Sequence, residues 1–234
     1  MRGICLSIFL LINKKNIRRL ILKITLKDVS KIFDNHTPKP IGSHKYFSVL
    51  IPFIEIDGEL YILYEVRSSK LKHQPGEVCF PGGRVEMGEG PMGAAIRETS
   101  EELGLPTDKI HIIGRGDIVY GYANYTLFSY IGMIDYKDYE KMKISEDEVE
   151  RVFLVKLSDL IKNPPEIFWE NISVSIEEDF PYKEELQVNE RNPWKGAKWS
   201  IPVYSPFPGE EAILWGLTAK ITAATVTTLV ENLT

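Results

Sequence analysis

The sequence predicts an α/β fold of the mixed (α+β) kind, in which helices sandwich a mixed β-sheet. Three observations indicate this fold: an early β-hairpin, a capped helix near the middle of the chain, and strand-like segments on both sides of that helix. The 234 residues show no internal repeat and no second domain. We expect residues 1–33 to be a leader and residues 34–234 to form one domain.

The hairpin is predicted over residues 46–66. An apolar stretch, YFSVLIPFIEI, is followed by Asp57-Gly58 and then by ELYILYEV. Asp-Gly between two apolar runs is a strong hairpin signal, because both positions of the tight turn favour these residues. The chain is then punctuated by Gly and Pro from residue 74 to residue 93.

A helix is predicted over residues 91–103. Pro91 suits the first helical turn, and Gly104 suits the position just after the end. At ~100° per residue, four residues fall in one arc that we expect to face the core: Met92, Ile96, Thr99 and Leu103.

The later elements follow from the same patterns. We expect strands at 109–120, 125–135 and 149–155, a short helix at 157–162, a long loop at 181–198 and a helical tail at 210–232. Helices and strands in this order indicate layers of helix around a mixed sheet.

The charge is unevenly distributed. The chain carries 28 basic and 33 acidic residues, and eight of the basic ones lie within residues 1–32 beside a single acid. The remaining acidic body argues against a nucleic-acid partner. Two cysteines, Cys5 and Cys79, cannot form a disulfide framework, so we expect a reduced, cytoplasmic setting, with Cys79 a small buried hydrophobe.

The leader contains an apolar run at residues 4–12, too short for a membrane span of ~20 residues. Its basic residues follow the run, the reverse of a secretory signal. We expect a helical extension or a start codon assigned too far upstream, and no membrane association. A weak interfacial anchor is the alternative.

Three glutamates stand at i, i+3 and i+4 on the polar face of the predicted helix: Glu98, Glu101 and Glu102. Each neighbouring pair repels by about 0.2–0.5 kcal/mol, which a solvated acidic face would tolerate. A divalent cation would turn the same cluster into a binding site, because Mg²⁺ prefers carboxylate oxygens. Acidic clusters that hold metals against phosphate serve phosphoryl chemistry.

Residues 83–105 resemble the signature of the Nudix hydrolases at every fixed position. The matching residues are Gly83, Glu89, Arg97, Glu98, Thr99, Glu101, Glu102, Gly104 and Leu105. The one soft departure is Thr99, at a position that is usually a bulky apolar residue. The resemblance implies the Nudix fold, an α/β/α sandwich around a mixed sheet, and cleavage of a nucleoside diphosphate linked to another moiety.

Carried over position by position, the resemblance assigns catalytic roles to Glu89, Arg97, Glu98, Glu101 and Glu102. The three clustered glutamates would bind Mg²⁺ or Mn²⁺, with the carbonyl of Gly83 as a further ligand. Arg97 would orient the glutamates, and Glu89 would support the loop or an outer-shell water.

The catalytic base is left open. Glu98 is one candidate, and an acid of a later loop, Glu146, Asp147 or Glu148, is another. For those three residues a solvated turn before a strand is the plainer interpretation.

The upstream segment resembles the coenzyme A pyrophosphatase subgroup of the same family. The matching residues are Arg67, Ser68, Lys72, Gly76, Phe80, Pro81, Gly82 and Gly83. Lys72 replaces the usual arginine, and Tyr64-Glu65 replaces a more usual Leu-Thr. A Trp-Gly-x-Thr-Ala run beginning at Trp215 also resembles this subgroup, although packing on the sheet is its plainer role.

The subgroup resemblance implies a substrate site at Arg67, Ser68, Lys72 and Phe80, whose cations would hold a phosphate. The implied function is metal-dependent hydrolysis of the diphosphate of coenzyme A or acyl-coenzyme A, giving 3′,5′-ADP and 4′-phosphopantetheine or its acyl form. One alternative is a pyrophosphatase for ADP-ribose, other nucleotide sugars or modified dNTPs. Another is a non-catalytic, nucleotide-binding regulatory module. The partner is then a small-molecule substrate, and a homodimer is left open.

Overall fold

The computed structural model describes residues 24–173, 179 and 197–233. Its main sheet has seven strands, and β1 (Lys45–Ile56) pairs with three of the others. β2 (Glu59–Arg67) returns antiparallel to β1 through Asp57-Gly58. Both turn residues have positive φ, 51° and 79°, as a type I′ turn requires. The predicted hairpin is therefore confirmed.

Five further strands complete the sheet: β3 (Val78–Cys79), β4 (Gly82–Arg84), β5 (His111–Gly121), β6 (Tyr125–Met133) and β7 (Val149–Lys156). β6 runs parallel to β1. The other pairings are antiparallel: β4 pairs with β1, β5 pairs with β6, and both β3 and β7 pair with β2. The sheet is mixed, and the three strands predicted after the central helix are confirmed with small shifts at their ends.

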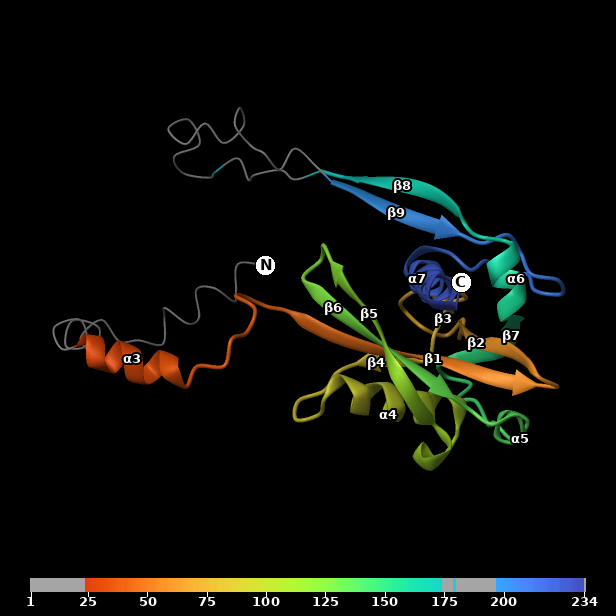
Figure 1. The fold of residues 1–234 in the computed structure, drawn as a ribbon, viewed down its shortest axis with the longest axis horizontal. Coiled ribbons are helices and arrows are strands. Elements are labelled where there is room, and N and C mark those ends of the chain that lie inside the picture. The colour runs from red at the N-terminus through yellow and green to blue at the C-terminus, as the bar shows by residue number, and fades with distance from the viewer. Residues whose placement is uncertain (1–23, 174–178, 180–196, 234) are drawn as a thin grey trace.

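Helices cover both faces of this sheet (Figure 1). α4 (Pro91–Leu103) packs on β1 from one side, and α7 (Gly216–Leu233) and α6 (Leu157–Lys162) lie on the other. β1 is apolar on both faces because both are covered. Leu50 packs with Ala95 of α4, and Ile51 belongs to the cluster that contains Ile221 of α7. The predicted helix–sheet–helix sandwich is confirmed.

The helical tail begins later than predicted, at Gly216 rather than at residue 210. The residues just before it do not join the helix, because Leu214 and Trp215 pair with another segment. The Tyr204 amide donates to the Leu214 carbonyl over 2.9 Å, and Trp215 forms an antiparallel bridge with Val203.

Sequence patterns missed a second, two-stranded sheet. β8 (Glu166–Ile172) and β9 (Ala197–Val203) pair antiparallel, and β9 contacts α7. β8 is exposed along almost its whole length, so it lacks the alternation that marks a half-buried strand. The loop predicted at 181–198 lies outside the described residues, except for its last two, which begin β9.

Three short elements complete the described chain: α3 (Leu26–Asp34), η1 (Thr107–Lys109) and α5 (Tyr136–Tyr139). α3 has a complete capping box, in which Thr25 and Asp28 satisfy each other's backbone amides, but it buries no side chain. It lies away from the sheet (Figure 1). Within the described residues, no helix has the length and apolar character needed to cross a membrane.

A chain that begins at Lys31 should fold with an unchanged unfolding temperature. This change removes most of α3, which buries no side chain, so the core of the described residues loses no contact. Thermal unfolding of the shortened and full chains in the same buffer checks it. Loss of solubility or a lower unfolding temperature would show that the predicted leader packs on the domain.

Candidate functional site

A turn and a helix position the acidic residues. Pro91 occupies the first turn of α4, and Gly104 ends the helix in the left-handed conformation with φ 62°. A side chain at residue 104 would not fit, because a Cβ there would lie 2.1 Å from the carbonyl oxygen of Lys143. The predicted helix over 91–103 is confirmed, with Pro91 in its first turn and Gly104 just after its end.

The buried face of α4 differs from the predicted one at Met92, which is 48% exposed. Thr99 and Leu103 are fully buried, and Ala94 and Ala95 take the place of Met92 near the sheet. Small side chains allow the helix to approach the sheet closely. The Thr99 hydroxyl donates to the Ala95 carbonyl over 2.7 Å, so a polar residue is satisfied at this position.

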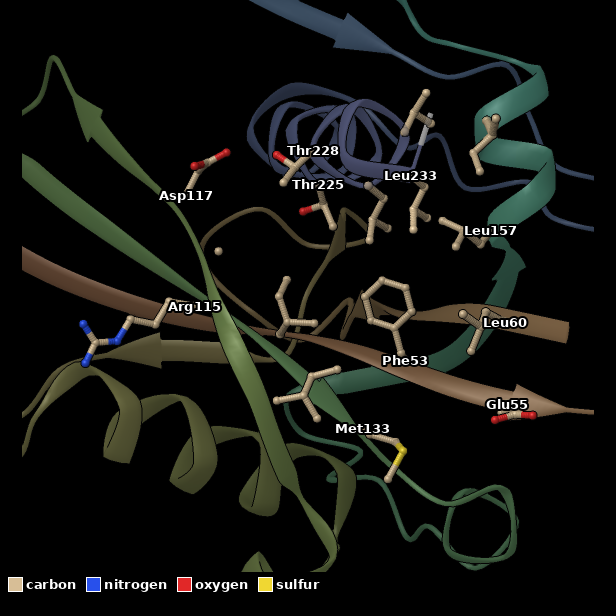
Figure 2. Close-up of a pocket in the computed structure, with 16 residues that line it drawn as sticks. Phe53, Glu55, Leu60, Arg115, Asp117, Met133, Leu157, Thr225, Thr228 and Leu233 are labelled. Carbon is tan, nitrogen blue, oxygen red and sulfur yellow. The ribbon is translucent and has the colours of Figure 1, made fainter. Parts of the chain in front are cut away.

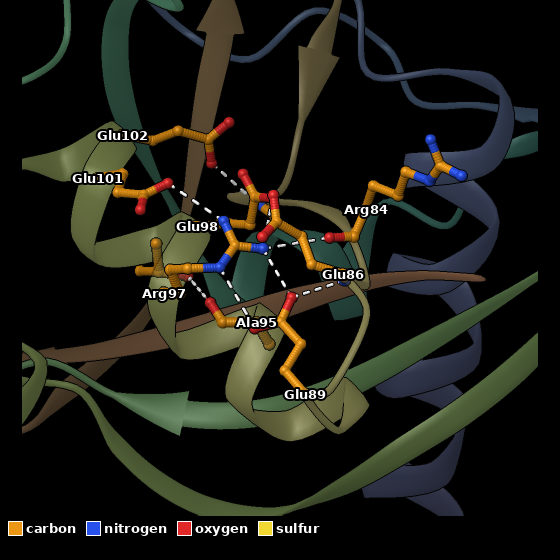
Figure 3. Close-up of polar contacts among 10 residues, drawn as sticks. Arg84, Glu86, Glu89, Ala95, Arg97, Glu98, Glu101 and Glu102 are labelled. Atoms are coloured by element: carbon orange, nitrogen blue, oxygen red, sulfur yellow. Dashed lines mark hydrogen bonds and ion pairs between the residues drawn. The ribbon is translucent and has the colours of Figure 1, made fainter. Parts of the chain in front are cut away.

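Arg97 connects the glutamates of the motif (Figure 3). It makes a bidentate pair with Glu89, with donor–acceptor distances of 3.2 and 2.8 Å. The same guanidinium lies 3.0 Å from Glu98 Oε1 and 3.2 Å from Glu101 Oε2, and donates to the Arg84 carbonyl over 3.1 Å. One cation therefore ties α4 to the preceding loop.

Two adjacent glycines bring the backbone against two glutamates. The Gly82 amide donates to Glu102 Oε2 over 2.8 Å. A Cβ on Gly83 would lie 2.4–2.6 Å from the carboxyl atoms of Glu98, so only glycine allows this approach. Because β4 pairs with β1, the sheet fixes both glycines opposite α4.

Negative charge exceeds positive charge in this cluster. Burial raises the pKa of Glu102, and the carboxylate of Glu65 raises it further. Burial also raises the pKa of Glu98, although the neighbouring Arg97 opposes that shift. Arg97 is already shared among three carboxylates, so it cannot balance them all.

The donor set fits a divalent cation. Carboxylate oxygens and a backbone carbonyl are the ligands that Mg²⁺ and similar hard ions prefer, and the surplus negative charge is of the right sign. Within the described residues, no three His, Cys, Asp or Glu side chains converge as a preformed metal cage. Binding would therefore require small rotations of Glu98, Glu101 or Glu102.

Another carboxylate, outside the motif, acts on this cluster. Glu65 of β2 is 1% exposed, and its Oε1 accepts a hydrogen bond from the Cys79 thiol over 3.0 Å. Its buried Oε2 has no hydrogen-bond partner among the described residues. Burial and Glu65 both raise the pKa of Cys79, so the thiol stays protonated and is a poor nucleophile. Cys79 is half-buried and hydrogen-bonded at the wall of the cleft, however, so the expectation of a buried hydrophobe is corrected.

The later acidic turn is exposed, as predicted. Glu146, Asp147 and Glu148 directly precede β7, and Asp147 pairs with Lys70 over 3.0 Å. Glu148 raises the pKa of both Glu98 and Glu102. Its charge therefore acts on the acidic cluster.

A cleft of about 680 Å³ opens beside the two glycines. Arg67 and Phe80 line it together with Gly82 and Gly83, so the structure unites these sequence-predicted positions. The cleft also has walls that sequence reasoning did not assign to a site: Trp199 and Ile201 of β9, and Trp215, Thr218 and Ile221 in and before α7. Trp215 is 44% exposed, so its side chain is not fully buried by packing on the sheet.

Ser68 and Lys72 are not among the residues that line this cleft. The Ser68 hydroxyl donates to the Glu146 carbonyl over 3.0 Å, and its amide donates to the Glu148 carbonyl over 2.8 Å. Ser68 therefore holds the acidic turn in place, and Lys72 is exposed on the neighbouring loop. The expectation that both residues contact substrate finds no support in this geometry.

A separate cavity of about 580 Å³ lies under the C-terminal half of α7 (Figure 2). It is lined mainly by apolar side chains, including Phe53, Leu60, Leu157 and Leu233. It shares no lining residue with the cleft. The glycines and glutamates of the polar site are therefore not part of it.

Fold and cluster together define the class of this protein: a mixed-sheet α+β domain whose acidic helix and glycine turn form one polar site at the edge of a cleft. The NUDIX domain model matches residues 45–175, which is more than half of the chain. The chain belongs to the Nudix family.

Curated relatives agree with this assignment. Nudix hydrolase 3 of Caenorhabditis elegans is 34% identical over 142 residues, which cover 58% of this chain and 59% of the relative. Peroxisomal coenzyme A diphosphatase NUDT7 of Mus musculus is 33% identical over 142 residues, 60% of this chain and 58% of the relative. Mitochondrial coenzyme A diphosphatase NUDT8 of Mus musculus is 34% identical over 118 residues, 49% of this chain and 56% of the relative. The alignments span little more than half of each relative.

Proposed function

We propose that this protein hydrolyses the diphosphate bond of coenzyme A or acyl-coenzyme A with the help of a divalent metal ion, Mg²⁺ or Mn²⁺. The products would be 3′,5′-ADP and 4′-phosphopantetheine or its acyl form. One observation carries the proposal: Arg67 and Phe80 line the same cleft as Gly82 and Gly83, which contact Glu102 and Glu98. A substrate with its diphosphate at the glycines would thus lie beside the acidic cluster, and the same cleft holds a cation for a second phosphate.

Nudix hydrolases generally use divalent metals, and the names of two relatives specify coenzyme A diphosphatase. When bound, the metal ion neutralises charge on the diphosphate and lowers the pKa of water. Glu98, Glu101 and Glu102, with the Gly83 carbonyl, would hold it. Arg97 keeps the glutamates in position through its contacts with Glu89 and the loop carbonyl of Arg84.

Removal of a proton from the attacking water requires a carboxylate near the cluster. Glu98 and Glu148 are the two candidates that the site provides. Glu98 contacts Arg97 and lies against Gly83, whereas Glu148 is exposed and its charge raises the pKa of Glu98 and Glu102. We propose to substitute each residue by glutamine and to compare the rates of hydrolysis, because the loss of the catalytic base should slow the reaction more.

Arg67 is the cation best placed for the extra 3′-phosphate of coenzyme A. Its Nε is buried and has no hydrogen-bond partner among the described residues, although the residue lines the cleft. An oxyanion would satisfy that donor by a charge-assisted hydrogen bond. Lys70, in contrast, is already paired with Asp147 at the surface.

Arg67→Ala should raise the KM for coenzyme A by about tenfold or more, because a charge-assisted hydrogen bond contributes roughly 1.5–3 kcal/mol. The KM for dephospho-coenzyme A, which lacks the 3′-phosphate, should change much less. Steady-state assays with Mg²⁺ on coenzyme A, acetyl-coenzyme A, dephospho-coenzyme A, ADP-ribose, NADH and dNTPs measure this.

Lys70→Ala serves as the matched control, since it removes a nearby cation that lies outside the cleft. Equal turnover of coenzyme A and dephospho-coenzyme A by the unmodified protein would contradict a 3′-phosphate site. Preference for ADP-ribose or a dNTP would support the alternative pyrophosphatase. Binding without turnover of any substrate would support a regulatory module.

We also propose a small-molecule partner rather than a nucleic acid, a homodimer as one assembly state, and the cytoplasm as the compartment. Two relatives carry peroxisomal and mitochondrial names, which makes the compartment a direct question for imaging. Fluorescent fusions at the C-terminus of the full chain would test it.

A further inference from the structure

The cleft beside the glycines continues past them across the main sheet. β6 pairs with one edge of β1, and β2 and β4 pair with the other edge. The segment with β3 and β4 separates Arg67 from β1, because β3 pairs with β2 and β4 pairs with β1. Tyr125 and Leu127 of β6 line the same cleft beyond β1. The cleft therefore has two ends, with Arg67 at one, Tyr125 at the other and the glycines between them.

The end beyond β1 is lined mainly by aromatic and apolar side chains. Phe47 and Tyr125 meet edge to face there, with ring centroids 6.1 Å apart, and Trp199 of β9 adds a further wall. The charged side chains among the described residues that line this end, Lys45 and Glu170, have opposite signs. This end thus has no surplus of lining charge for a phosphate, in contrast to the end with Arg67.

Trp199 is held in its orientation by two neighbours. The Lys220 ammonium of α7 lies 3.6 Å from the centroid of a Trp199 ring, a cation–π contact. Tyr122, in the turn between β5 and β6, packs edge-on against Trp199 with centroids 5.5 Å apart (Figure 1). Trp199 is still only partly buried and lines the cleft. It is therefore a preformed apolar wall, which a ligand can contact at little cost in ordering.

The distance from the glycines to this end suits a long substituent on the diphosphate. Gly83 is opposite Ser48 of β1. Lys45, three residues earlier, is opposite Tyr125 of β6, so two strand spacings and three residues separate Gly83 from Tyr125, roughly 14 Å. In coenzyme A the diphosphate lies between the 3′-phosphoadenosine and the pantetheine arm, whose far end is the thiol or thioester. With the 3′-phosphate at Arg67, this arm would run from the glycines toward Trp199.

We propose that Trp199, with Tyr125 and Ile201, forms a subsite for the acyl group, which makes this chain prefer thioesters of coenzyme A that carry an apolar acyl chain over free coenzyme A. The inference rests on the proposed function for the positions of the diphosphate and the 3′-phosphate. β9, which supplies Trp199 and Ile201, lies outside residues 45–175 that the family model matches. The subsite is thus a feature that membership of the family does not imply.

The test compares kcat/KM for hexanoyl-coenzyme A and for free coenzyme A with Mg²⁺ present. The variants are Trp199→Ala and Trp199→Leu. Trp169→Ala is the matched control, since Trp169 is an exposed tryptophan of the same two-stranded sheet and is not among the residues that line the cleft. Inhibition by the product 3′,5′-ADP reports on the other end of the substrate.

The unmodified chain should favour hexanoyl-coenzyme A by about tenfold or more, the effect of partly burying several methylene groups. Trp199→Ala should bring the ratio close to one and leave kcat/KM for free coenzyme A and inhibition by 3′,5′-ADP little changed. Trp199→Leu should keep part of the preference, and Trp169→Ala should keep all of it. A merely structural role of Trp199 would lower both kcat/KM values together.

An equal kcat/KM for the two compounds in the unmodified chain would overturn the proposal, as would an unchanged ratio in Trp199→Ala. Inhibition by 3′,5′-ADP that weakens in Trp199→Ala would place the adenosine at this end and also overturn it. If Trp199→Ala does not fold, Ile201→Ala decides in the same assay, and an unchanged ratio there overturns the subsite.

Failure of the proposed function is separable from failure of the subsite. If the chain hydrolyses neither compound, the proposed function is contradicted, and titration calorimetry without metal decides the subsite. Tighter binding of hexanoyl-coenzyme A than of coenzyme A, lost in Trp199→Ala, supports the subsite. Equal binding of the two compounds, or binding of neither, overturns it.

Discussion

Glu102→Gln should reduce hydrolysis by at least ~100-fold, because it removes a metal-binding charge from the site. The domain should remain folded. A glutamine side-chain oxygen can still accept the Gly82 amide, which now donates to Glu102 Oε2 over 2.8 Å. Steady-state rates with saturating Mg²⁺, together with thermal unfolding of the metal-free protein, measure both effects.

The same variant has a defined effect on the pH dependence of stability. Burial and Glu65 raise the pKa of Glu102 above its ordinary value of 4.5, so the ionised form is disfavoured in the folded state. Metal-free stability should therefore fall as the pH rises above 4.5, and Glu102→Gln should reduce that fall. Glu101→Gln is the comparison, since Glu101 is exposed. Full activity in Glu102→Gln would contradict the assignment of the metal site.

Alanine at the two adjacent glycines should produce two different defects. A Cβ on Gly82, which has φ 151°, would lie 2.3 Å from the Ser48 carbonyl oxygen and 2.6 Å from the Val49 Cα. Because backbone atoms cannot move aside, Gly82→Ala should lower the free energy of unfolding by about 3 kcal/mol or more. A Cβ on Gly83 meets only the carboxyl end of Glu98, which can swing away.

Gly83→Ala should therefore cost less than about 1 kcal/mol of stability but should lower the hydrolytic rate by up to ~100-fold, since it displaces a reacting group. Urea unfolding and initial rates on coenzyme A separate the two outcomes. Gly88→Ala, where a Cβ meets open space, controls for a loop glycine with positive φ. Equal stability of both variants, or full activity in Gly83→Ala, would show that these contacts do not shape the site.

The sequence was most informative where local patterns decide the structure. The Asp57-Gly58 hairpin, the helix between Pro91 and Gly104, and the spacing of the glutamates on that helix all depend on neighbouring residues. The clamp by Arg97 was expected for the same reason, because its partners lie within one loop–helix unit. The roles of these residues in metal binding and catalysis stay predictions.

Long-range contacts account for most of what the sequence did not predict. Trp199 enters the cleft only because β9 pairs with β8 and contacts α7, and no local signal marks it as a site residue. Ser68 matched a substrate motif, yet its hydrogen bonds go to the turn at Glu146 and Glu148. Met92 fits the apolar period of the helix but is exposed, and Ala94 and Ala95 are buried instead. Packing against the sheet, and not the period of the helix alone, decides which side chains are buried.

The parallel pairing of β1 with β6 has a consequence for the kinetics of folding. Lys45 is opposite Tyr125, so the chain must close a loop of some 80 residues before these strands can meet. Loop closure over long separations is slow to nucleate, whereas the hairpin of β1 with β2 is local. We expect the hairpin to form first and the docking of β6 to limit the folding rate. Val49 has Gly82 and Ser129 as its strand partners, on β4 and β6, so the glycine turn should gain its final rigidity only in that last step.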